Sequence, residues 1–137
     1  KANTSHKCNL KTIICVGESE DERINGKTTK IITEQLTESL PLSATINNTI
    51  IAYEPRWAIG TGKTPNNNEI LEVHEILRNQ ITELRSKSVA SAMRIIYGGS
   101  VNPKNCSEIF GINGVDGALV GGASLSAANL KDIINSA

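Results

Sequence analysis

Four short apolar runs divide the chain, and segments of helical pattern separate them. The runs are nearly continuous rather than alternating, which is typical of strands that are buried on both faces. They cover residues 12–16, 49–53, 94–97 and 117–120. The alternation of strand and helix predicts parallel strands joined by helical crossovers.

Two long helices are predicted between these runs. The first ends before Pro41, because proline cannot continue a helix. The second begins at Asn66, which forms a capping box with Glu69 three residues later. Their apolar faces are formed by Ile32, Leu36 and Leu40 in the first helix and by Ile70, Val73, Leu77, Ile81 and Leu84 in the second.

Two further helices are predicted towards the carboxyl end. One has Asn102 as its N-cap, Pro103 as its first residue and Gly111 near its end. The other runs over about residues 126–134, and residues 1–10 resemble the end of a preceding helix. The chain therefore contains four βα units. Local pattern fits two arrangements of them: a small open α/β sheet, or half of a (β/α)₈ barrel, which takes about 250 residues.

Composition narrows the class of protein. Acidic and basic residues balance at 14 each, which argues against broad electrostatic binding of nucleic acid or of an anionic membrane. No apolar run approaches the roughly 20 residues that a membrane-spanning helix needs. Cys8, Cys15 and Cys106 are too widely spaced to predict a disulfide framework or a zinc site, so a reducing cytoplasm is expected. The chain begins with Lys1 rather than Met, and we expect an upstream segment.

Glu54 carries the strongest chemical signal. It directly follows the second apolar run, and Pro55, Trp57 and several small residues come after it. A carboxylate at a strand end beside a flexible loop suits a general base. The simpler interpretation is an exposed carboxylate in a turn. A nucleotide-binding loop is excluded, because the Walker pattern requires glycine at the position of Trp57.

Paired glycines follow the last two apolar runs. Gly98 and Gly99 precede Ser100, and Gly121 and Gly122 follow the fourth run. Glycine lets backbone N–H groups approach an anion closely, and a serine hydroxyl can donate to it. One such pair usually indicates a tight turn only. Two pairs after consecutive strands match the phosphate site that barrels build after their last two strands.

Several of these segments together resemble the triosephosphate isomerase family. The resemblance rests on residues 52–64 (Ala-Tyr-Glu-Pro-Arg-Trp-Ala-Ile-Gly-Thr-Gly-Lys-Thr), 15–19 (Cys-Val-Gly-Glu-Ser), 97–101 (Tyr-Gly-Gly-Ser-Val) and 120–125 (Val-Gly-Gly-Ala-Ser-Leu). It implies a TIM barrel of which this chain covers strands five to eight, and a reaction that needs neither metal nor organic cofactor. Glu54 would move a proton between adjacent carbons of a triose phosphate.

The resemblance also implies roles for other residues. Phosphate contacts would come from Gly60, Ser100, Gly121 and Gly122. A lid over the substrate would comprise Pro55, Trp57, Ala58, Ile59, Thr61, Gly62 and Lys63, and Tyr97 with Ser100 would hold it closed. Cys15 and Glu18 would support the base from behind. Arg56 departs from the family's usual small apolar residue at its position.

Simpler roles are expected for the remaining polar residues. Cys15 lies in an apolar strand and is expected to be a small buried residue, and Glu18 to make structural hydrogen bonds. Arg23 and Lys27 are expected to be solvated. His6 and His74 lie away from strand ends, and neither is expected to be catalytic.

The family's first four strands carry a lysine and a histidine that polarise the substrate carbonyl, and this chain offers no equivalent. Half a barrel also exposes strand edges and apolar surface, so we expect it to need a complementary amino-terminal half or self-association. Three hypotheses follow: a fragment of triosephosphate isomerase, an inactive remnant that binds phosphate or has a structural role, and a different (β/α) enzyme acting on a larger phosphosugar.

Overall fold

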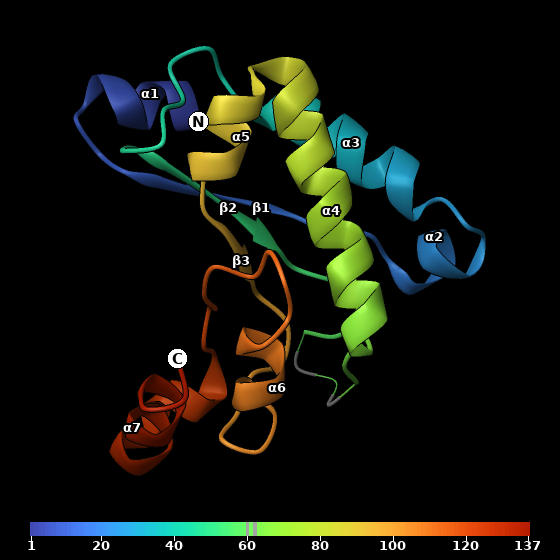
Figure 1. The fold of residues 1–137 in the computed structure, drawn as a ribbon, viewed down its shortest axis with the longest axis vertical. Helices are drawn as coiled ribbons and strands as arrows, with labels where there is room; N and C mark the ends of the chain where they lie inside the picture. Colours follow the sequence, from blue (N-terminus) through green and yellow to red (C-terminus); the bar gives the residue numbers. More distant parts are fainter. Residues whose placement is uncertain (60, 62) are drawn as a thin grey trace.

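A parallel sheet of three strands forms the centre of the molecule (Figure 1). The computed structural model describes residues 1–59, 61 and 63–137. The strands are β1 (Thr12–Val16), β2 (Thr49–Tyr53) and β3 (Ile95–Tyr97), and they lie in chain order. Thr12 pairs with Thr49, and Ile51 pairs with Ile95. The first two predicted strands are confirmed at both ends, and the third begins one residue later than predicted.

The predicted fourth strand is wrong as a regular strand. Its segment runs parallel to β3 but forms only an isolated bridge between Tyr97 and Ala118. Two hydrogen bonds hold it, from the N–H of Tyr97 to the carbonyl of Gly117 (3.0 Å) and from the N–H of Leu119 to the carbonyl of Tyr97 (2.8 Å). Gly117 has a φ of 151°, a conformation open mainly to glycine, and this interrupts the extended backbone.

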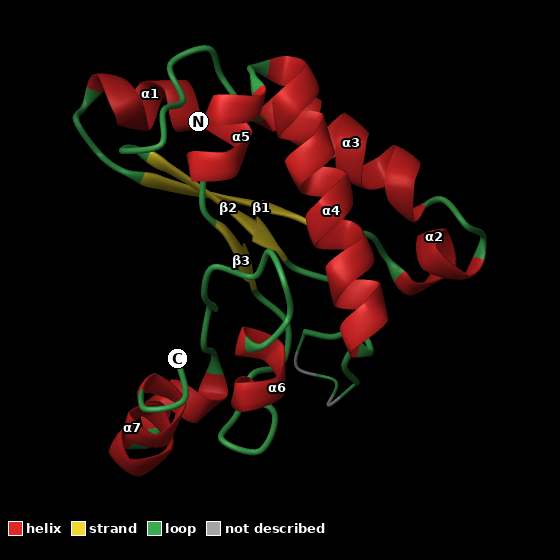
Figure 2. Cartoon of the chain, in the orientation of Figure 1, coloured by secondary structure: helices red, strands yellow, loops and turns green. Residues whose placement is uncertain are grey.

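Helices α3 (Thr28–Ser39) and α4 (Asn67–Leu84) lie side by side over one face of the sheet (Figures 1 and 2). Both predicted helices are confirmed, and α4 begins at the expected capping box of Asn66 and Glu69. Their apolar faces cover the strand side chains that point the same way. This layer forms the core, whose fully buried members include Ile32, Leu36, Ile51, Tyr53, Leu77, Ile81, Ile95 and Tyr97.

Three helices complete this side of the molecule: α1 (Ala2–Lys7), α2 (Glu20–Ile24) and α5 (Lys87–Ala92). The first agrees with the expected helix near the amino end. The other two were not predicted, although Ser19 and Glu22 form a capping box at the start of α2. None of the helices in the described part of the chain is long and apolar enough to cross a bilayer.

The carboxyl end folds into α6 (Cys106–Phe110), the 3₁₀-helix η1 (Gly122–Leu125) and α7 (Ala127–Ile134). The last helix agrees with the prediction and is capped by Ser126. The predicted start of α6 is wrong by three residues. The side chain of Asn102 accepts a hydrogen bond from the N–H of Lys104 (2.9 Å), and Asn105 becomes the N-cap. Asn102 therefore caps a turn rather than the helix.

The other face of the sheet is partly bare. On β1, Ile14 and Val16 point into the core, whereas Ile13 is 47% exposed and Cys15 is also exposed. The expectation that Cys15 is buried is therefore wrong within this chain. Alternate residues of a strand point to opposite faces, so Ile13 and Cys15 lie on the face of β1 that is turned away from the core. An open apolar face of this kind agrees with the half barrel expected from the sequence.

Candidate active site

Glu54 lies where the ends of all three strands come together. Its backbone N–H donates to the carbonyl of Val16 at the end of β1 (2.8 Å). On the other side, the N–H of Gly98 donates to the carbonyl of Tyr53 at the end of β2 (2.8 Å). The segments that follow β1 and β3 therefore hold the backbone at Glu54 from both sides.

A cavity of about 500 Å³ opens beside Glu54. Its lining includes Glu54, Ile59 and Ser100, and both predicted glycine pairs. The structure thus brings a carboxylate, a serine hydroxyl and two glycine turns around one space. A carboxylate that shares such a cavity with glycine turns can act on a small anionic substrate.

The two glycine pairs at this cavity differ in whether packing requires the absence of a side chain. A Cβ atom at Gly98 would lie 2.6 Å from the Cγ of Glu54, so a side chain there would displace the carboxylate. A Cβ atom at Gly99 would overlap the Tyr97 hydroxyl. Gly121 and Gly122 have open space around the same position. Packing therefore explains the first pair, and the second pair is free to serve a ligand.

Cys15 lies next to the candidate base. Partial burial of the thiol and the negative charge of Glu54 raise the pKa of Cys15 to about 11. The same residues, together with Gln35 and Arg56, line a second and smaller hollow. Cys15 is thus a thiol that stays protonated at neutral pH and lies beside Glu54.

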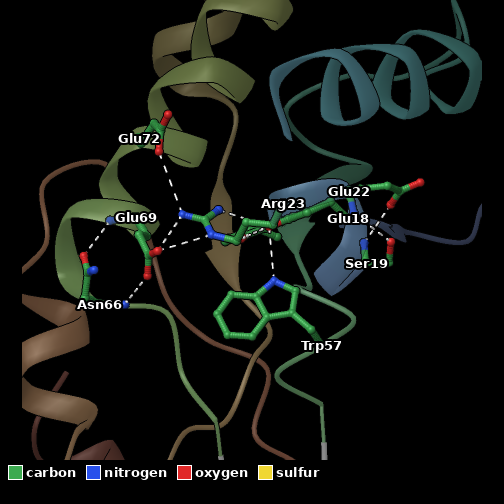
Figure 3. A network of polar contacts seen from close by, with 9 residues as sticks. Glu18, Ser19, Glu22, Arg23, Trp57, Asn66, Glu69 and Glu72 are labelled. Atoms are coloured by element: carbon green, nitrogen blue, oxygen red, sulfur yellow. Dashed lines mark hydrogen bonds and ion pairs between the residues drawn. The ribbon is translucent and has the colours of Figure 1, made fainter. Parts of the chain in front are cut away.

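Glu18 is fully buried and lies at the centre of a polar network (Figure 3). Its Oε1 atom accepts hydrogen bonds from the Tyr53 hydroxyl (3.0 Å), the Trp57 indole N–H (3.2 Å) and Arg23 (3.1 Å). Burial, followed by the charge of Glu18, raises the pKa of Tyr53. Glu18 does not line the cavity, which agrees with the structural role expected for it.

Arg23 is not solvated, contrary to expectation. Its side chain is only 17% exposed and pairs with both Glu18 and Glu69. Glu18 is only five positions away along the chain, whereas Glu69 is 46 positions away and was not indicated by any local pattern. Lys27, the second residue expected to be solvated, is exposed.

The loop between β2 and α4 carries the predicted lid residues. Pro55 and Ala58 are buried, whereas Ile59 is half exposed. The Thr61 hydroxyl donates to the carbonyl of Trp57 (2.9 Å), and Lys63 forms an ion pair with Glu20 of α2. The predicted lid residue Gly62 and the predicted phosphate contact Gly60 lie outside the described residues.

Tyr97 carries a buried hydroxyl that has no hydrogen-bond partner among the described residues. Burial raises the pKa of Tyr97 to about 12. An unpaired buried hydroxyl is costly, because the group has lost its hydrogen bonds to water without gaining another partner. The hydroxyl points beneath Gly99, next to the cavity.

Neither histidine lines the cavity. Nδ1 of His74 lies 3.0 Å from the carbonyl of Gly114, and His6 lies between Ser43 and Thr12 near the amino end of β1. The lining that the structure describes contains no lysine, arginine or histidine. Among the described residues there is also no cluster of side chains that could hold a metal ion. Within the described residues, the cavity lining thus contains the carboxylate of Glu54 but no cationic side chain.

Comparisons with known proteins agree with this geometry. The family model described as triosephosphate isomerase matches residues 1–137. The chain is 50% identical over 127 residues to a triosephosphate isomerase of Rhizobium meliloti, an alignment that covers 93% of this chain and 49% of that protein. It is 47% identical over 128 residues to one from Chlorobaculum tepidum, covering 93% of this chain and 52% of that protein.

A solved structure gives the same result. The crystal structure of triosephosphate isomerase from Bartonella henselae superposes with a TM-score of 0.90 at 37% identity, over 99% of this chain and 54% of that one. The fold is therefore part of a TIM barrel. The chain spans about half the length of the curated relatives it matches.

Proposed function

Because the chain belongs to the triosephosphate isomerase family, we propose that it supplies the base and the phosphate-binding turns of a triosephosphate isomerase. The reaction interconverts dihydroxyacetone phosphate and D-glyceraldehyde 3-phosphate, a step of glycolysis and gluconeogenesis in the cytoplasm. The observation that carries the proposal is the shared cavity, which is lined by Glu54, Ser100, Gly121 and Gly122.

Glu54 acts as the general base in the proposed mechanism. Its carboxylate removes a proton from the substrate carbon next to the carbonyl and returns it to the neighbouring carbon, through an enediolate. The backbone N–H groups of Gly121 and Gly122 and the hydroxyl of Ser100 hold the substrate phosphate, together with Gly60. No step requires a metal or an organic cofactor.

The loop after Glu54 serves as the lid in this proposal. Pro55, Trp57, Ala58, Ile59, Thr61, Gly62 and Lys63 cover the substrate. The unpaired hydroxyl of Tyr97 gains a partner from the closed loop, and Ser100 assists. Support comes from the position of Tyr97 beside the cavity and from its lack of a partner among the described residues.

We place the chain in the carboxyl-terminal half of the barrel, as strands five to eight. Support comes from the two glycine turns, since barrels commonly build their phosphate site after strands seven and eight. Enediolate formation also needs donors that stabilise the developing negative charge, and losing one such donor commonly costs about 10²–10³ in rate. The missing lysine and histidine would come from an amino-terminal half or from another copy.

The test mixes this chain with a separately produced amino-terminal half of a relative and measures isomerisation of glyceraldehyde 3-phosphate. Glu54→Gln is expected to lower the restored activity by roughly 10²–10⁴. Glu75→Gln is the matched control, because it removes the same charge from an exposed position on α4. Restored activity that is indifferent to Glu54 contradicts the mechanism.

A second candidate is an inactive remnant that binds phosphate or has a structural role. It is favoured by the lack of a cation in the described lining of the cavity. It predicts that inorganic phosphate shifts the amide resonances of Gly121 and Gly122 in the chain alone, without any turnover. Turnover by the chain alone excludes it.

A further inference from the structure

Arg23 lies between the two ends of the loop that joins β2 to α4 (Figure 3). This loop, residues 54–66, begins at the candidate base and ends at the N-cap of α4. Arg23 itself belongs to neither end, since it comes from α2, which follows β1. Any link that Arg23 makes between the two ends of the loop is therefore made from α2, which is not part of the loop.

At the front of the loop, Arg23 contacts Trp57 in two ways. Its guanidinium carbon lies 5.8 Å from the centre of the indole ring, and its NH1 group donates to the same Glu18 oxygen that accepts the indole N–H. A cation over an aromatic face and a shared buried carboxylate both favour this position of the indole.

At the rear of the loop, Arg23 holds the carboxylate that caps α4. Its Nε and NH2 groups lie 3.3 Å and 3.0 Å from Oε1 of Glu69. The other oxygen of Glu69 accepts from the backbone N–H of Asn66 (2.7 Å). In return, Oδ1 of Asn66 accepts from the N–H of Glu69 (3.0 Å). The position of Asn66 thus depends on the carboxylate that Arg23 orients.

A purely structural ion pair is the simpler interpretation, and the geometry argues against it. Glu72, the third acidic neighbour, lies 3.9 Å away and is 59% exposed, so it contributes little. The two close partners of Arg23 each make a second hydrogen bond to an opposite end of the loop. Arg23 is therefore the shared member of two networks that would otherwise be separate.

We propose that Arg23 is a positioning residue that couples the two ends of the loop. Release of Trp57 from Glu18 then loosens the cap at Asn66, and loosening of the cap at Asn66 favours release of Trp57. The meaning of this coupling for catalysis rests on the proposed function, because only there does the loop cover a substrate. Coupling between two ends is reciprocal in free energy: if loss of the contact at one end weakens the other, loss of the other weakens the first.

The test uses Trp57, the only tryptophan in the chain, as a probe. Acrylamide quenching of its fluorescence is compared in the full chain and in the Glu69→Gln variant. Glutamine still serves in a capping box, so this change keeps the cap but removes the ion pair with Arg23. The expected result is a roughly two- to fivefold rise in the quenching rate constant of Trp57, although Glu69 does not contact the indole.

Glu75→Gln is the matched control, since it removes a carboxylate from the exposed side of the same helix. The reciprocal measurement is hydrogen exchange at the Asn66 amide in Trp57→Phe, which lacks the indole N–H. Exchange is expected to accelerate there as well. In an Arg23→Gln background, Glu69→Gln is expected to change Trp57 quenching no further.

The inference is overturned if Glu69→Gln leaves Trp57 quenching unchanged, or if Glu75→Gln raises it equally. A cap that acts alone would change exchange at Asn66 without changing the indole. Neither measurement uses substrate. Coupling without isomerase activity in the mixing experiment overturns the proposed function alone, whereas activity without coupling overturns only the role of Arg23.

Discussion

Gly17 packs directly against the backbone of Glu54, so that any side chain at Gly17 would overlap the Glu54 carbonyl group. The contact joins the end of β1 to the residue that follows β2. It is a contact between two backbones, so neither partner can move aside by changing a side-chain rotamer. The position of the candidate base thus depends on a residue without a side chain.

Gly17→Ala is therefore expected to destabilise the chain, by about 1–3 kcal/mol or more, because overpacking forces backbone shifts. Gly121→Ala is the matched control, since its Cβ atom would meet open space. Urea unfolding of both variants measures the difference. Equal midpoints for the two would show that the contact at Gly17 relaxes freely.

Cys15 should react slowly for an exposed thiol. With a pKa of about 11, about one part in a thousand is ionised at pH 8, and only the thiolate is alkylated. We expect iodoacetamide to modify the exposed Cys8 well before Cys15, as followed by mass spectrometry of the intact chain and its peptides.

Glu54→Gln should accelerate the alkylation of Cys15 by roughly three- to tenfold, because it removes the nearby negative charge. Glu75→Gln should leave the rate unchanged. An equal rate of Cys15 alkylation with and without the Glu54 carboxylate would show that Glu54 does not affect the pKa of Cys15.

Stability should fall below neutral pH because of His74. Burial lowers the pKa of folded His74, and the hydrogen bond to Gly114 offsets only part of this effect. Unfolded histidine takes up a proton below about pH 6.5. The unfolded chain then binds more protons than the folded chain, so this contribution to stability is present above about pH 6.5 and is lost as the pH falls.

Urea unfolding at pH 7 and pH 5 measures this loss. His74→Asn should show a smaller loss, because asparagine can still donate towards the Gly114 carbonyl but does not titrate. Equal losses in both proteins would assign the pH dependence to other groups.

Loss of the hydroxyl group should affect folding stability differently at the two buried tyrosines. Tyr53→Phe removes a hydrogen bond to the buried charge of Glu18 and should cost about 1–3 kcal/mol of folding stability. Tyr97→Phe removes a buried hydroxyl that has no partner among the described residues, so it should be neutral or stabilising.

In the mixed-half assay, Tyr97→Phe should nevertheless lower isomerase activity, because the proposed lid loses its holding contact. Chemical unfolding and the activity assay together separate the two effects. Full activity in a stable Tyr97→Phe protein would remove Tyr97 from the lid.

Local chemistry made much of the fold predictable. The strands β1 and β2 are short runs of β-branched and apolar residues. The start of α4 is marked by the capping box of Asn66 and Glu69, a signal that spans only four residues. The box of Ser19 and Glu22 at α2 is an equally local signal, and it was overlooked. Glu54 was predicted as a base because a carboxylate, a proline and glycines follow a strand in one continuous segment.

The features that were not predicted depend on contacts between distant residues. Arg23 contacts Glu69 from 46 positions away, and nothing near Arg23 in the sequence indicates that partner. The exposure of Cys15 depends on what covers its face of the sheet, which the strand itself does not determine. The missing ladder at residues 117–120 follows from the unusual φ of Gly117 and from pairing on one side only.

The order of the strands in space, β1 then β2 then β3, repeats their order in the chain. A polypeptide leaving the ribosome can therefore add each new strand to the free edge of those already made, and no earlier pairing has to open. Each addition closes a loop of about 40 residues, as the pairings of Thr12 with Thr49 and of Ile51 with Ile95 indicate. Such a sheet is suited to assembly during synthesis, one strand and one helix at a time.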